Sequence, residues 1–374
     1  MKRVVLTVTN DVFTDQRVNK MAQTLKDMGF DPLIIGVIRN GSLPFSPPWA
    51  TVKRIPLIFQ KGFLFYAGFN LKLFVVLLFA KADLIIANDL DTLLAAHLAA
   101  KIRRKPLIYD THEYFTGSPE VAGRPFRLWF WSSLENILFP KQDTIITVNQ
   151  SIAQAYEKKF RKSLLVVRNM PRYRLPDLSR TRKDLGLPEA KHIILLQGSG
   201  INTDRGTEEL IYAMRPEYGI DNALLLIIGG GNVTERIKKQ VTLENLNDRV
   251  WFLPKMHYEN LIQYTSHATI GVSLDKPTSL NYLLSLPNKL FDYIMAGTPV
   301  LASNLPEVRH VVEKYKVGKI AQNHNPAHFA QCIKEMLADS EQLRSWHLNC
   351  LKAAKELNWE TEEQTIRSIF HKFL

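Results

Sequence analysis

Short, almost uncharged apolar runs separated by helix-length stretches are the feature that most constrains how this chain can fold. They occur in both halves of the sequence, at residues 4–9, 32–38, 83–87, 106–110 and 143–148, and then at 192–198, 223–231, 250–254, 269–274 and 298–303. Strands that are apolar on both faces and alternate with helices are typical of a parallel sheet covered on both sides. The sequence therefore predicts an α/β fold.

The segment 168–190 interrupts this alternation. It is rich in Pro and Arg and has no apolar period, so it predicts a linker. A chain of 374 residues is also longer than the roughly 250–300 residues at which single cores stop growing. We expect two Rossmann-like, doubly wound domains, at about residues 1–172 and 173–355, followed by an amphipathic helix within 356–374.

The charge balance favours anionic partners. The chain has 48 Lys and Arg against 36 Asp and Glu, a net charge of +12, which suits nucleotides, nucleic acid or an acidic membrane. We expect no nucleic acid, because no concentrated basic stripe or recognition motif is present.

The cysteines and the first residues indicate where the protein works. Cys332 and Cys350 form neither a disulfide framework nor a metal-ligand spacing, which favours a reducing compartment. Residues 1–13 are typical of a first strand and not of a signal peptide. We therefore expect a cytoplasmic protein.

For two apolar segments, a membrane contact is one of two interpretations. Lys72 divides the region 62–87 into uncharged runs of 10 and 8 residues, too short to span a bilayer, so we expect a buried helix, with shallow membrane contact as the alternative. The region 124–141 is either core or a patch for an anionic inner membrane face. It mixes three cations with four aromatic residues: Arg124, Arg127 and Lys141 with Phe126, Trp129, Phe130 and Trp131.

Polar residues gather where the predicted strands of the first half end, the edge at which parallel sheets bind ligands. Asp110, His112 and Glu113 follow one strand, and we expect Asp110 and Glu113 to bind substrate. The imidazole suits an acid, a base or a sugar hydrogen-bond donor, although a lone His is often structural. In Asp89-Leu90-Asp91 we interpret Asp91 as a helix cap. We therefore expect no metal site.

Glycine-rich loops follow two strands of the second half. In GSGINTDRG, Gly198 and Gly200 would let backbone N–H groups approach a phosphate, and Arg205 would add a charge-assisted contact. Gly230, within GGG, suits the same close approach. Neither loop has a dinucleotide fingerprint or a Walker lysine, so ordinary turns remain the alternative.

The stretch SLPNKLFDYIMAGTPVLAS (285–303) predicts a helix and a strand. Pro287 suits the start of the helix, Gly297 its left-handed cap, and the apolar residues share one face. Asn288, Lys289 and Asp292 share another face. This polar face is either a solvent-exposed Lys–Asp pair or a ligand pocket.

Taken with YDTHE and the Gly198–Arg205 loop, these stretches resemble the retaining, nucleotide-sugar-dependent glycosyltransferases of the GT-B fold, family 4 type. The likeness extends over nearly the whole chain. TDQRVNKMAQTLKDMGF (14–30) resembles the family's first loop and helix, and PNKLFDYIMAGTPVLASNLPEV (287–308) carries the most specific likeness. It implies that the final helix crosses back onto the first domain.

The resemblance also implies roles for particular residues. Arg205 and Lys255 would hold the donor diphosphate, Asp292 would bind the nucleotide ribose, and His112 would face the donor sugar. Asp15 and Arg17 would lie on the acceptor side. The usual pair of Glu residues is altered, because Leu284 and Asp292 occupy those two positions.

The expected activity is transfer of a sugar from a nucleoside diphosphate sugar to a glycan or lipid-linked acceptor, in cell-surface polysaccharide synthesis. Retention is implied by the resemblance alone. We expect no cofactor. The alternatives are an epimerase of the same fold, a nucleotide-sugar-binding protein without turnover, and a basic nucleic-acid binder.

Overall fold

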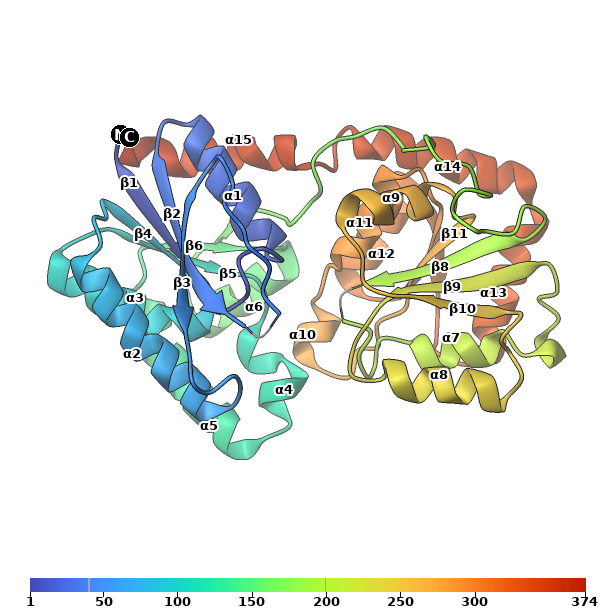
Figure 1. Ribbon diagram of the computed structural model, residues 1–374, viewed down its shortest axis with the longest axis horizontal. Helices are drawn as coiled ribbons and strands as arrows, with labels where there is room; N and C mark the ends of the chain where they lie inside the picture. The colour runs from blue at the N-terminus through green and yellow to red at the C-terminus, as the bar shows by residue number, and fades with distance from the viewer. Residues whose placement is uncertain (40, 199) are drawn as a thin grey trace. The chain divides into compact units, whose positions relative to one another are not determined.

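Two parallel sheets form the framework of the computed structural model, which describes residues 1–39, 41–198 and 200–374 (Figure 1). The first sheet has the order β3-β2-β1-β4-β5-β6-β7 and the second the order β10-β9-β8-β11-β12-β13. Every strand pair in both sheets is parallel. The predicted pair of doubly wound α/β domains is confirmed.

The strands of the first sheet are β1 (Arg3–Thr7), β2 (Asp31–Ile38), β3 (Thr51–Pro56), β4 (Leu84–Asn88), β5 (Leu107–Thr111), β6 (Thr144–Thr147) and β7 (Leu165–Val166). Those of the second are β8 (His192–Gly198), β9 (Ala223–Gly229), β10 (Val250–Leu253), β11 (Ile270–Ser273), β12 (Val300–Ser303) and β13 (Gly318–Ala321). The strands that the sequence missed, β3, β7 and β13, are at the sheet edges. There the strand need not be apolar; β3, for example, carries Lys53, Arg54 and Pro56.

Helices cover both faces of each sheet. Beside the first sheet are α1 (Gln16–Asp27), α2 (Phe63–Phe79), α3 (Leu90–Arg103), α4 (Pro119–Ala122), α5 (Pro125–Leu138), α6 (Gln150–Phe160) and most of α15 (Trp359–Phe370). Beside the second are α7 (Thr207–Ala213), α8 (Thr234–Leu243), α9 (Tyr258–Ser266), α11 (Asn288–Met295), α12 (Pro306–Tyr315), α13 (Pro326–Ala338) and α14 (Ser340–Ala354). The short α10 (Leu280–Leu283) connects β11 to α11.

The chain divides into two compact units. The first holds Met1–Asn169, Ser279–Asn281 and Thr361–Leu374, and the second holds Met170–Thr278 and Tyr282–Glu360. The main division lies within the segment that we interpreted as a linker, three residues before the expected boundary. The end of the chain groups with the first unit, to which Glu362 is joined by a hydrogen bond from the Arg168 backbone N–H (2.8 Å).

The topology fixes where each unit can bind a ligand. In the first sheet β1 lies between β2 and β4, with Val5 opposite both Leu33 and Ile85. In the second, β8 lies between β9 and β11. At such a point the connections leave in opposite directions and open a crevice beyond the carboxyl ends of the strands.

Local sequence signals are found at the ends of two helices, although only Gly297 acts as predicted. The carboxylate of Asp15 accepts a hydrogen bond from the Val18 N–H at the start of α1 (3.1 Å). Gly297, with φ of 72°, follows α11, and the next N–H reaches back to the Tyr293 carbonyl. Pro287 lies one position before α11 and not in its first turn.

The two apolar segments behave differently from expectation. In α2 the residues Phe65, Phe69, Leu73 and Leu77 are buried, but the opposite side is exposed; the prediction of a buried helix is therefore wrong for that side. In α5, Trp131 is only 7% exposed and packs on Tyr66, so it belongs to the core and not to a surface patch. No helix among the described residues is both long and apolar enough to cross a bilayer.

Candidate active site

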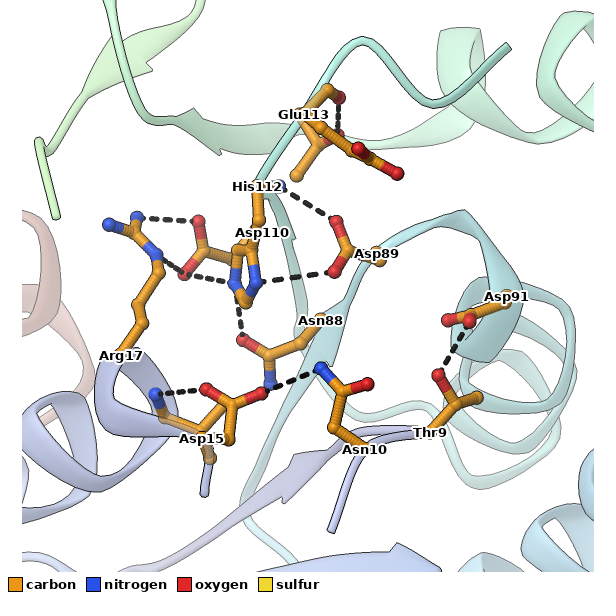
Figure 2. Close-up of polar contacts among 12 residues, drawn as sticks. Thr9, Asn10, Asp15, Arg17, Asn88, Asp89, Asp91, Asp110, His112 and Glu113 are labelled. Atoms are coloured by element: carbon orange, nitrogen blue, oxygen red, sulfur yellow. Dashed lines mark hydrogen bonds and ion pairs between the residues drawn. The ribbon is translucent and has the colours of Figure 1, made fainter. Parts of the chain in front are cut away.

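A buried ion pair lies at the carboxyl edge of the first sheet (Figure 2). Arg17, from α1, donates to both carboxylate oxygens of Asp110, at the end of β5, over 3.0 and 2.8 Å. A third nitrogen of Arg17 donates to the Val167 carbonyl (2.7 Å). We expected both side chains to bind substrate, but both are almost fully buried. Their polar atoms have protein partners, and Asp110 also lies beside His112.

His112 lies between two carboxylates and an amide. Its Nδ1 is 3.2 Å from Asp89 Oδ2, and its Nε2 is 3.2 Å from Asn88 Oδ1 and 3.5 Å from Asp110 Oδ2. Burial alone would lower the pKa of His112, but Asp89 and Asp110 outweigh it and hold that pKa well above its ordinary value. Burial likewise opposes the ionised form of Asp110, yet Arg17 and His112 hold the Asp110 pKa well below its usual range. The imidazole is therefore a fixed positive charge and not a free base.

Asp89, whose carboxylate contacts His112, has a strained backbone conformation. Its φ of 61° and ψ of 164° lie in a region that is almost restricted to glycine and costs about 1–3 kcal/mol. The carboxylate makes no capping bond to α3; it accepts instead from the His112 backbone N–H (2.8 Å). Such strain persists only where neighbouring contacts enforce it, which is typical of functional sites.

Our interpretation of Asp91 as a helix cap is wrong. Asp89 occupies the cap position, and Asp91 lies in the first turn of α3, buried against Thr9, whose hydroxyl is 2.5 Å from Asp91 Oδ2. Burial, reinforced by Asp89, raises the pKa of Asp91 to about 8. In the described part of the chain, Asp91 Oδ1 has no hydrogen-bond partner.

Glu113 is a second carboxyl with a raised pKa. Burial and the Asp89 charge raise its pKa to about 7, and its Oε2 accepts from the Asn281 amide (2.7 Å). The expected substrate residue Asp15 is half-buried; besides capping α1, it accepts from the Asn10 amide (3.1 Å). This edge thus contains both fixed charges and carboxyls that can exchange protons.

In the second unit, two cations share one buried carboxylate. Asp275, which follows β11, is 3.0 Å from Arg205 Nη1 and 3.6 Å from Lys289 Nζ. The Arg205 guanidinium also lies over the Tyr282 ring, 4.4 Å from its centroid. Burial lowers the pKa of Lys289, although Asp275 opposes that effect. Because one negative charge faces two positive charges, the cluster has a local excess of positive charge, which suits an anionic ligand.

The partners of Asp292 decide between the two interpretations of the polar face of α11. Its Oδ1 accepts from the Tyr258 hydroxyl (2.9 Å) and its Oδ2 from the Gln197 amide (3.3 Å). Lys289, which we expected beside Asp292, pairs with Asp275 instead. The face is therefore not a local Lys–Asp pair, and Asp292 joins α11 to the end of β8.

The glycine loops after β8 and β9 lie side by side. The Ile201 N–H donates to the Gly230 carbonyl (3.0 Å), and a Cβ on Gly229 would lie only 1.8 Å from the Gly198 carbonyl oxygen. At Gly198, Gly200 and Gly230 a side chain would meet no such backbone clash. Ser199, within the same predicted loop, lies outside the described residues.

Lys255, a predicted site residue, does not join the cluster of Asp275, Arg205 and Lys289. It is exposed in the connection after β10, the edge strand of the second sheet. No ion pair involves it among residues 1–39, 41–198 and 200–374, and the cation that shares a carboxylate with Arg205 is Lys289. Asn288 is exposed at the first position of α11.

Sequence reasoning missed Asp275, Tyr258 and Gln197. The signal for Asp275 is a single acid directly after the buried strand β11, but its partner Arg205 lies 70 positions earlier. In the ranges that the structure describes, no group of three or more His, Cys, Asp or Glu side chains is placed to hold a metal ion.

Family models match the two units separately. The model described as Glycosyltransferase Family 4 matches residues 15–169, and the model described as Glycosyl transferases group 1 matches residues 178–352. Together they cover most of the chain, in the order that the resemblance predicts.

Curated relatives match over part of their length. A D-inositol 3-phosphate glycosyltransferase of Nocardia farcinica is 26% identical over 202 residues, 51% of this chain and 43% of the relative. A chitobiosyldiphosphodolichol beta-mannosyltransferase of Candida albicans is 22% identical over 252 residues, 63% of this chain and 55% of the relative. The chain therefore spans about half the length of the curated relatives it matches.

Solved structures show the same fold over the full chain. A sucrose-phosphate synthase from Thermosynechococcus elongatus has a TM-score of 0.81 at 18% identity, covering 100% of this chain and 99% of that one. The Anabaena protein HepE, solved in complex with UDP-glucose, has a TM-score of 0.77 at 16% identity, covering 100% of both chains. At these identities the likeness concerns the fold.

Proposed function

The chain belongs to the GT-B glycosyltransferases of the family 4 type, and we propose that it transfers a sugar from a nucleoside diphosphate sugar to a glycan or lipid-linked acceptor. The transfer retains the anomeric configuration and serves cell-surface polysaccharide synthesis on the cytoplasmic side. This proposal follows the family and the chemistry of the second unit.

The observation that carries the proposal is the shared carboxylate of Asp275. Because Arg205 and Lys289 are held together by a single negative charge, the cluster keeps a net positive charge at the carboxyl edge of the second sheet. A diphosphate carries the complementary charge, and charge-assisted bonds to Arg suit its oxygens. Asp292, which accepts from Tyr258 and Gln197, would accept from the ribose hydroxyls when the donor binds.

The same cluster supports the chemical step. When the bond between the sugar and the diphosphate breaks, negative charge grows on the leaving group, and cations fixed in advance stabilise it without reorganisation. Two side-chain cations can supply the charge that a metal supplies elsewhere, so we propose turnover without a metal or cofactor. In the first unit, the positively charged His112 would face the donor sugar.

A second candidate is a nucleotide-sugar-binding protein without turnover. Leu284 and the shorter Asp292 replace the two Glu residues of the family pattern, and Leu284 cannot hydrogen-bond a sugar through its side chain. An epimerase of the same fold would instead convert the donor itself.

One experiment separates these functions. The protein is incubated with a panel of nucleotide sugars, starting with UDP-glucose, together with a mixture of glycan and lipid-linked acceptors, and free nucleotide, glycosylated acceptor, converted donor and bound donor are detected by mass spectrometry. Release of nucleotide that persists with a chelator and is lost in Arg205→Ala supports the proposal. Donor that binds without release indicates the binding protein, and a converted sugar still attached to nucleotide indicates the epimerase.

A further inference from the structure

The outer side of α2 is unusually apolar for a helix that faces away from a core. Leu64, Leu71, Val75 and Phe79 form a stripe opposite the buried side, and Leu71 and Phe79 are 68% and 85% exposed. Lys72 is the one charged residue among the 17 of this helix. A helix on the surface of an α/β domain normally presents charged and polar side chains there.

The stripe continues onto neighbouring helices. α3 packs beside α2 and α5 beside α3, and Figure 1 shows the three along the same side of the first sheet. α3 exposes Leu98 and Ile102, and α5 exposes Phe126, Trp129 and Ile137. An edge-to-face contact between Phe63 and Phe130, with centroids 5.6 Å apart, joins the starts of α2 and α5. We call this surface the α2/α3/α5 face.

The concentration of apolar side chains on this face is far above the average for the chain. These helices contain 45 of the 374 residues, yet they carry 10 of the 24 large apolar side chains that are exposed in the described residues. Contiguous apolar surface of this kind marks a protein or membrane interaction site.

Within α2, α3 and α5 the exposed charges have one sign, and just beyond the helix ends the cations outnumber the exposed Asp83 and Glu120. The only acidic residues in α2, α3 and α5 are Asp91 and Glu135, and both are buried. Exposed cations lie among the apolar residues and at the helix ends: Lys61, Lys72, Lys81, Lys101, Arg104 and Arg124. A basic surface with aromatic and aliphatic side chains between its charges matches an anionic lipid interface.

We propose that the α2/α3/α5 face docks the protein on an anionic bilayer, with the apolar stripe of α2 inserted among the lipid headgroups. A second copy of the chain is a poorer occupant, because it would bring cations face to face. Nucleic acid is a poorer occupant because it offers no apolar surface to the stripe. The inference rests on the proposed function in one respect: docking on a bilayer would bring the enzyme to the lipid-linked acceptor proposed above.

The test is vesicle flotation with the full chain. Vesicles of phosphatidylcholine with about one third phosphatidylglycerol should retain the protein at low salt, less so at high salt and least without the anionic lipid. The double variant Leu71→Ser with Phe79→Ser should reduce partitioning at least tenfold, because both side chains are outside the core. Leu243→Ser with Leu348→Ser, which removes exposed leucines of the second unit, is the matched control and should bind as the wild type does.

Two double charge-reversal variants test the electrostatic contribution to vesicle binding. Lys72→Glu with Lys101→Glu should weaken binding strongly, whereas Lys239→Glu with Lys334→Glu, at exposed positions of α8 and α13, should change it little. UDP binding by calorimetry is measured on every variant. Vesicle binding by a protein that binds no nucleoside diphosphate of the panel would overturn the proposed function alone.

Three outcomes would overturn the docking surface. The first is wild-type protein that fails to float with anionic vesicles, and the second is a Leu71/Phe79 variant that floats as well as wild type. The third is a wild-type dimer that light scattering shows to become monomeric in that variant, which would make the face a subunit interface.

Discussion

Replacing Asp275 with asparagine removes the charge that holds Arg205 and Lys289 together while keeping the shape of the side chain. At 3.0 and 3.6 Å, each attraction is about 5 kcal/mol at an effective dielectric constant of about 20. Rehydration of the two cations offsets part of this, and breaking a buried pair typically costs about 3–5 kcal/mol. Water reaches Arg205 and Lys289, so we expect about 3 kcal/mol.

Thermal unfolding and ligand protection provide the assay. A loss of about 3 kcal/mol corresponds to a decrease of roughly 6–12 °C in melting temperature for a unit of this size. UDP should then raise the melting temperature of Asp275→Asn more than that of the wild type, because the diphosphate supplies the missing negative charge.

The pH dependence adds a second check. The pKa of Lys289 is already lowered by burial, and Asp275→Asn removes the carboxylate that opposes this. A Lys pKa that is lower in the folded than in the unfolded state makes stability rise with pH between those two values. The deficit of the variant should therefore shrink between pH 7 and about 9.

The control is Asp221→Asn. Asp221 is also 3.0 Å from an arginine, Arg249, but its carboxylate is 77% exposed, and such surface pairs contribute only about 0–1 kcal/mol. If Asp275→Asn is no less stable than this control, or if UDP protects it no better than wild type, the shared-carboxylate reasoning is refuted.

Further predictions concern single side chains. Because the pKa of Asp91 is raised to about 8, its contribution to stability is complete below its ordinary pKa and is lost as the pH rises to 8. Urea unfolding should therefore show Asp91→Asn gaining by more than about 1 kcal/mol relative to wild type between pH 5 and 8; a constant difference would contradict the raised pKa. Asp292→Ala should weaken binding of the donor's nucleoside diphosphate by about 1.5–3 kcal/mol, roughly 10- to 150-fold, in calorimetric titration, and unchanged affinity in the folded variant would remove it from the pocket. Lys289→Ala should weaken UDP binding at least about tenfold, whereas Lys255→Ala should change it little; the reverse result would show that the edge loop holds the diphosphate.

The fold could be predicted because its signals are local. A strand buried on both faces needs a continuous apolar run, as β8 and β9 have, and the bounds of β8 match the predicted run. Helix ends are equally local, as Asp15 and Gly297 show. The edge strand β3 escaped prediction because one of its sides need not be apolar.

The site could be located by strand ends, but its pairings could not be predicted. Arg17 and Asp110 are 93 positions apart, and only the fold shows that they bind each other and not a ligand. Lys289 was assigned to Asp292 by helical spacing, whereas a buried carboxylate from another element attracts it more strongly. The exposed side of α2 could not be predicted from the sequence for another reason. This helix is apolar all round, so no helical period of apolar residues distinguishes its outer side from its buried side.

The grouping of residues 361–374 with the first unit affects how the protein can be assembled during synthesis. Ile366 and Phe370 of α15 are fully buried, and Glu363 accepts a hydrogen bond from Thr24 of α1 (2.8 Å). The second unit is nearly continuous in the chain, and its last core residue, Leu357, precedes this segment. The first unit begins earlier but finishes last, so its apolar surface beneath α15 stays uncovered while the rest of the protein is made. Loss of residues 361–374 would thus uncover the core of the first unit, although more than 190 residues separate the two in the sequence.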